Sequence, residues 1–140
     1  MSDSEIVTVP QQSLVVVADG HQAILLRTQG VKDSMSLSEE QRLTPMNLAE
    51  EGPSGSRPEE QTPRQTNEAT FAKQVAQTLF TLKEAGKFKH MILIADPQTL
   101  GQLREVFHKT VADSIILSLN KELTNHSLDD IAAIIRNAAG

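Results

Sequence analysis

One short apolar run that ends abruptly in a helix-start signal constrains this chain most. Residues 91–95 are apolar throughout, which is typical of a central parallel strand covered on both faces. Asp96 can cap the first turn of a following helix. Pro97 suits the first helical position, because the N–H that it lacks would be unpaired there anyway. A strand that leads directly into a capped helix predicts an α/β fold, in which binding sites lie at such junctions.

The remaining patterns predict the element order β-β-β-α-β-α-β-α. Residues 14–18 and 23–28 form a hairpin around the turn signal Asp19-Gly20, and Met35, Leu37 and Leu43 indicate a third strand. The other expected elements are a helix that ends at Gly86, a helix over 97–109, a strand from Ile115 to Leu119, and a last helix that a capping box of Ser127 and Asp130 begins. We expect a ribonuclease H-like mixed five-stranded sheet in order 3-2-1-4-5, with the first three strands antiparallel and helices on both faces.

Length and composition indicate one domain in a reducing compartment. The 140 residues include no cysteine, so disulfides and thiolate metal sites are excluded, and the acidic start and lack of a long apolar run favour a cytoplasmic protein without a membrane span. Residues 1–66 hold ten acids and five bases, whereas residues 67–140 hold eight of each, which argues against a whole-molecule nucleic-acid binder. We expect a flexible N-terminus over 1–12 and one domain over 13–140, with a mobile Pro/Gly-rich loop at about 47–65.

Several segments, taken in order, resemble one known family. They are residues 14–20, 23–26, 55–57, 71–76, 86–89, 93–97, 100–104 and 121–124. Together they resemble the bacterial host attachment protein family, which is also described as bacterial relatives of the middle domain of archaeal and eukaryotic release factors. The resemblance implies a role in attachment to host cells or an ancestral tie to the ribosome, and no defined biochemical activity.

The chain also departs from that family's pattern. It has Asp96-Pro97 where the family usually has two prolines, Lys121-Glu122 where the family favours Lys-Asp, and a shortened loop. Release factors hydrolyse peptidyl-tRNA through a Gly-Gly-Gln loop, and this sequence contains none. Peptide release is therefore not expected.

The sharpest candidate site lies beyond the strands 14–18 and 91–95. If these strands are parallel neighbours, Asp19 and Asp96 share one cleft, with His21 beside them. Together with Glu68 and with Asp129 or Asp130, they would supply the carboxylates of a two-metal nuclease. Each acid also has a structural explanation as a turn residue or a helix cap. We therefore expect no catalytic residue, metal or cofactor, and a binding cleft formed by the following residues: Asp19, His21, Asp96, Arg104 and Lys121.

A second candidate is a basic cluster at the end of the helix that precedes residue 91. It consists of Lys83, Lys87, Lys89 and His90. Cations there complement the helix dipole, and they could equally contact RNA phosphates, with Arg104 and Lys121 extending the patch.

Two functions follow from these candidates. The favoured hypothesis is a non-catalytic module that binds the ribosome, RNA or another protein, and the alternative is a divalent-metal-dependent nuclease or phosphoesterase. The chain is expected to be a monomer, or a homodimer through the uncovered edge of the third strand.

Overall fold

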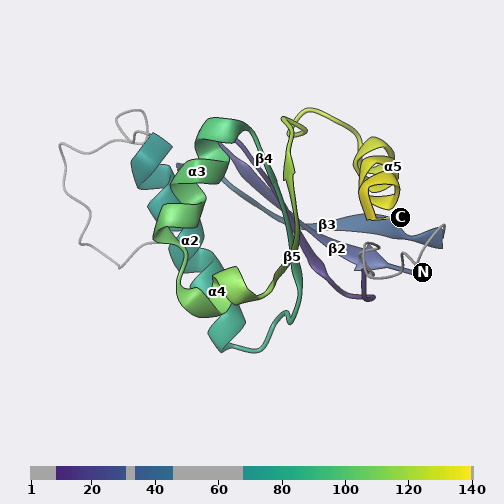
Figure 1. The fold of residues 1–140 in the computed structure, drawn as a ribbon, viewed down its shortest axis with the longest axis horizontal. Coiled ribbons are helices and arrows are strands. Elements are labelled where there is room, and N and C mark those ends of the chain that lie inside the picture. Colours follow the sequence, from purple (N-terminus) through teal and green to yellow (C-terminus); the bar gives the residue numbers. More distant parts are fainter. Residues whose placement is uncertain (1–8, 31–33, 46–67, 140) are drawn as a thin grey trace, which may run out of the picture.

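The computed structural model describes residues 9–30, 34–45 and 68–139, so the expected loop at 47–65 and residues 1–8 lie outside the described part (Figure 1). The strands are β1 (Leu14–Ala18), β2 (Ala23–Gln29), β3 (Ser36–Leu43), β4 (Met91–Ala95) and β5 (Ile115–Asn120). The helices are α2 (Glu68–Glu84), α3 (Pro97–Val106), α4 (Lys109–Asp113) and α5 (Leu128–Ala139). None of the described helices is long and apolar enough to cross a membrane.

The five strands form one mixed sheet in the order β3-β2-β1-β4-β5, which confirms the predicted topology. β1 is antiparallel to β2, β2 is antiparallel to β3, and the pairs β1–β4 and β4–β5 are parallel. Leu14 pairs with Met91 and Ala18 with Ala95, so β1 and β4 end level with each other. Asp19 and Asp96 therefore lie next to each other along the sheet, each directly after the carboxyl end of its strand.

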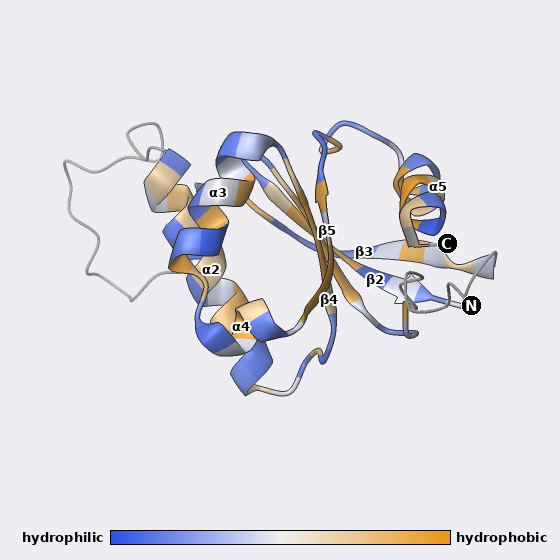
Figure 2. Ribbon diagram, in the orientation of Figure 1, coloured by the Kyte–Doolittle hydropathy of each residue, from blue (hydrophilic) through white to orange (hydrophobic). Residues whose placement is uncertain are grey.

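The sheet separates two apolar layers (Figures 1 and 2). Helices α2, α3 and α4 cover one face, where Val16 and Leu93 belong to a core that includes Phe71 and Leu79 of α2. α5 covers the other face, where Val15 and Ile94 pack in a core with other buried apolar residues, which include Ile131 and Ile135 of α5. All five residues of β1 and all five of β4 are buried, because helices cover both of their faces.

Local signals set most element boundaries as expected. Gly86 ends α2 with a φ of 73°, a left-handed conformation that favours glycine, and its N–H donates to the carbonyl of Lys83 at 3.0 Å. One of the two hydrogen bonds of the predicted capping box is confirmed, because the Oγ of Ser127 accepts from the N–H of Asp130 at 3.1 Å.

The prediction of one helix over 97–109 is wrong. α3 ends at Val106, and Phe107 has an extended backbone with a ψ of 135°. His108 then caps the separate helix α4, since its Nδ1 accepts from the N–H of Thr110 at 3.1 Å. The break separates α3 from α4, and Phe107 between them is partly buried against the core on this face of the sheet.

Candidate functional site

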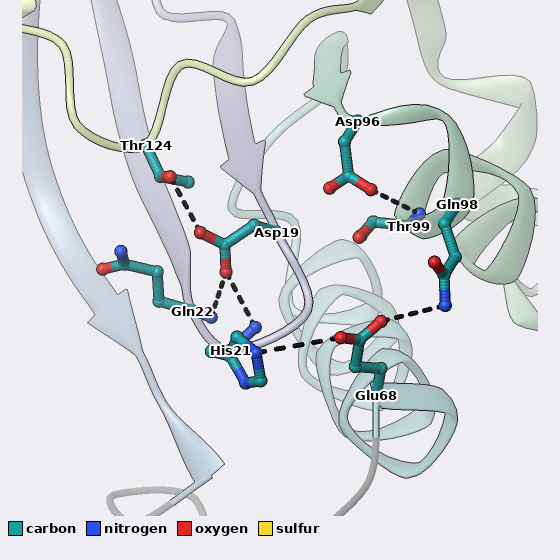
Figure 3. A network of polar contacts seen from close by, with 8 residues as sticks. All are labelled: Asp19, His21, Gln22, Glu68, Asp96, Gln98, Thr99 and Thr124. Atoms are coloured by element: carbon teal, nitrogen blue, oxygen red, sulfur yellow. Dashed lines mark hydrogen bonds and ion pairs between the residues drawn. The ribbon is translucent and has the colours of Figure 1, made fainter.

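Asp19 closes the β1–β2 turn and ties it to a distant loop. Its Oδ1 accepts hydrogen bonds from the N–H groups of His21 at 2.7 Å and Gln22 at 2.9 Å. Its Oδ2 accepts from the hydroxyl of Thr124, 105 residues along the chain, at 2.8 Å (Figure 3). Both carboxylate oxygens therefore have partners that hold the fold together.

Asp96 and Glu68 extend this polar network across the end of β4. Asp96 caps α3 by accepting from the N–H of Thr99 at 3.2 Å, as its sequence position predicts. Glu68 accepts from the side-chain amide of Gln98 at 3.1 Å, and its other oxygen lies 3.7 Å from Nε2 of His21 (Figure 3). Glu68 thus connects the turn after β1 with the first turn of α3.

The close approach of Glu68 depends on Gly20. A Cβ atom at this position would overlap Cδ of Glu68, because it would come closer than real Cβ atoms come to their neighbours. The glycine thus leaves the space that the Glu68 side chain occupies.

The carboxylates do not assemble into a metal-binding set in the described part of the chain. No group of three or more His, Asp or Glu side chains that could hold a metal ion occurs among residues 9–30, 34–45 and 68–139. Asp129 and Asp130 lie in the first turn of α5, where negative charge complements the helix dipole. The arrangement therefore gives the nuclease hypothesis no support.

Arg104 and Lys121 differ in their relation to this network. The N–H of Lys121 donates to the carbonyl of Ala95 at 3.0 Å, so the Lys121 backbone lies beside the end of β4, and the residue is exposed. Arg104 is exposed in the last turn of α3. Sequence reasoning missed the network partners Gln98 and Thr124, whose contacts with Glu68 and Asp19 depend on how distant elements pack.

A groove of about 470 Å³ lies at the other end of β4, and it collects most of the expected basic cluster. Lys87, Lys89 and His90 come from the segment between α2 and β4, and Arg27 comes from β2. The remaining lining residues are Pro10, Gln11, Gln12, Glu40, Gly86 and Phe88. Lys83 lies next to this set, with its Nζ 5.6 Å from the ring centroid of buried Phe88. We call the residues that line this groove, together with Lys83, the basic groove.

Glu40, the acidic residue that lines the basic groove, does not neutralise the lysines there. Glu40 receives two hydrogen bonds from the guanidinium of Arg27, at 3.1 and 3.0 Å, and a third Arg27 nitrogen donates to the carbonyl of Gln12 at 3.2 Å. Lys87 and Lys89 are exposed, and neither forms an ion pair with the part of the chain that the structure describes. The two lysines therefore leave the groove with a local positive charge that is available to an anion.

Arg27 is a groove residue that the sequence reasoning missed. It shares one strand face with Ala23 and Leu25, both of which are buried, and its own side chain is 11% exposed. A cation that directly continues a run of four apolar residues, Ala23 to Leu26, is the signal that could have identified it.

No curated protein matches the chain. Ten solved protein chains match it in structure, and one of them, an archaeal protein, has a TM-score of 0.48 and 15% sequence identity. That match covers 90% of this chain and 34% of the archaeal protein, so the chain spans about a third of that protein's length.

A family model matches far more of the chain than any local motif does. The matched family carries a release-factor description, and the name host attachment protein is not part of it. The match covers residues 12–135, which include all five strands and most of α5. The chain belongs to the bacterial archaeo-eukaryotic release factor family 12.

Proposed function

We propose that this chain is a non-catalytic module that binds RNA of the translation machinery through the basic groove. The observation that carries the proposal is the placement of Lys87, Lys89 and His90 around one groove whose acid, Glu40, is already bound to Arg27. The two lysines have no ion-pair partner among the described residues and can approach phosphates without first breaking a salt bridge.

The chemistry of the groove favours the RNA backbone over the bases. Lysine binds phosphate as a flexible point charge, and half-buried His90 adds a ring N–H donor. The whole sequence has four Phe and no Tyr or Trp, so it offers little surface for base stacking. Contacts of this kind position a protein on RNA but carry little sequence information.

Family membership is consistent with an RNA ligand in translation. Release factors act on the ribosome, and we propose that this member of a release-factor family binds there as well. The sequence has no Gly-Gly-Gln, so peptide release is not part of the proposal. Binding to the ribosome would place the protein in the cytoplasm.

The experiment is RNA binding measured at graded KCl, by fluorescence anisotropy with a labelled single strand and by co-sedimentation with ribosomes. The double variant Lys87→Gln/Lys89→Gln should bind more weakly. If each lysine contacts one phosphate, the slope of log K against log[KCl] should fall by about 1.4, because each lost contact removes about 0.7.

A matched control separates the groove from net charge. Lys73→Gln/Lys109→Gln removes one charge from α2 and one from α4. Neither lysine lines the basic groove. This control should keep the wild-type slope. Equal slopes in both double variants, or ribosome retention that does not respond to salt, would contradict the proposal and indicate a protein partner instead.

A further inference from the structure

Gln12, which lines the basic groove, has an unusual backbone conformation for a residue that carries a side chain. Its φ is 67°, in the left-handed region, and among the described residues other than glycine only Gln12 has a positive φ. Glycine adopts this conformation without steric cost, whereas a residue with a Cβ atom does not. Backbone outliers of this kind concentrate at binding sites, where the surrounding structure holds them in place. The side chain at position 12 therefore calls for a functional explanation.

The surrounding structure fixes the backbone of Gln12 on both sides. Its N–H donates to the carbonyl of Thr28 at 2.9 Å, and its carbonyl accepts from the guanidinium of Arg27 at 3.2 Å. Arg27 is in turn held by two hydrogen bonds to Glu40, at 3.1 and 3.0 Å. The next residue, buried Ser13, donates its N–H to the hydroxyl of buried Thr28 at 2.9 Å. Groups of β2 thus hold the unfavourable conformation of Gln12 in place before any ligand binds.

The side chain of Gln12 is free to bind a ligand in the groove. Gln12 is exposed, and its side-chain amide forms no hydrogen bond within the part of the chain that the structure describes. An amide carries N–H donors beside an oxygen acceptor, so it can recognise a group that offers the reverse pair. Lys87 and Lys89 line the same groove. The groove therefore combines cations that can hold phosphates with one amide that can hydrogen-bond a neighbouring base.

We propose that Gln12 gives the basic groove a preference for adenine, by pairing its side-chain amide with the edge of an unpaired base. This inference rests on the proposed function, that the groove binds RNA. Adenine offers an amino donor beside a ring-nitrogen acceptor, which matches the amide of glutamine in two hydrogen bonds. In single-stranded RNA these base edges are accessible to side chains. Because the backbone of Gln12 is already fixed, less ordering entropy is lost when the two hydrogen bonds form.

The test compares two labelled strands by fluorescence anisotropy at graded KCl: a short oligouridine, and the same strand with one adenosine at its centre. Wild type should bind the adenosine strand about tenfold more tightly, which is within the discrimination of one pair of hydrogen bonds to a base. Gln12→Gly should abolish this preference. It should keep the wild-type slope of log K against log[KCl], because no phosphate contact is lost. Its Tm should not fall, since glycine suits the left-handed conformation.

A second variant separates the amide of Gln12 from its backbone. Gln12→Met keeps an unbranched side chain without the amide, and it should also abolish the preference. Gln77→Met is the matched control, because it makes the same exchange at an exposed glutamine of α2 outside the basic groove.

A preference for adenine that survives in both Gln12 variants would overturn the inference. So would equal binding of the two strands by wild type. If that equal binding still depended on Lys87 and Lys89, the proposed function would stand without this inference. If wild type bound neither strand at low salt, the proposed function would fail together with it.

Discussion

Removal of the Asp19 carboxylate should destabilise the fold more than removal of an exposed acid. Asp19 accepts three hydrogen bonds, from two backbone N–H groups and the Thr124 hydroxyl. At about 1 kcal/mol net for each bond, Asp19→Ala should lower the free energy of unfolding by about 3 kcal/mol. Asp19→Asn should cost about 1 kcal/mol, because one amide oxygen can keep both N–H groups and the Thr124 hydroxyl can turn from donor to acceptor.

Urea unfolding and thermal melting measure these differences. For a domain of this size, a loss of 3 kcal/mol corresponds to a fall in Tm of about 10 °C. Thr124→Val removes one of the three bonds and should cost about 1 kcal/mol. Glu122→Ala, in the same loop but exposed, is the control and should change stability by less than about 0.5 kcal/mol.

We infer that Asp19 stabilises the fold by linking the β1–β2 turn to the loop after β5. Unchanged stability in Asp19→Ala would refute it, since three bonds cannot then contribute to the fold. If that variant lost RNA binding at full stability, Asp19 would be a ligand-binding residue, as the sequence pattern also allowed.

Three further predictions test the fold and the polar network. Gly20→Ala should cost less than about 1 kcal/mol, because its Cβ meets the flexible end of Glu68, and NMR should show the Gln98 side-chain amide shifting as that contact breaks. Leu93→Ala, at a fully buried site in β4, should lower the unfolding free energy by about 3 kcal/mol in urea, and a cost below about 1 kcal/mol would contradict its central position. Millimolar Mn²⁺ should shift Tm by less than about 1 °C, since the described carboxylates form no three-ligand group, and a large rise would revive the metal hypothesis.

The fold was largely predictable because its signals are local. Apolar runs long enough for one strand, together with the turn at Asp19-Gly20 and the cap at Asp96, determine most elements and their order. The break between α3 and α4 was not predictable in the same way. Val106 and Phe107 continue the apolar helical spacing, and a histidine such as His108 is a weak capping signal that competes with that pattern.

The candidate site was predictable only where a residue acts on its own neighbours. Asp19 and Asp96 bond to amides two or three residues away, and such contacts leave a sequence signature. The contact of Glu68 with Gln98 spans 30 residues, and that of Arg27 with Gln12 spans 15. These contacts arise from the packing of whole elements, so no local pattern indicates them.

We propose that the basic groove binds RNA. NMR titration of the labelled protein with a short single-stranded RNA tests this claim most directly. We predict shifts in the backbone amides of Gln12, Arg27 and residues 87–90, which line the groove. Shifts confined to residues 19–22 and 96–99 at the other end of the sheet, with the groove unaffected, would contradict the claim.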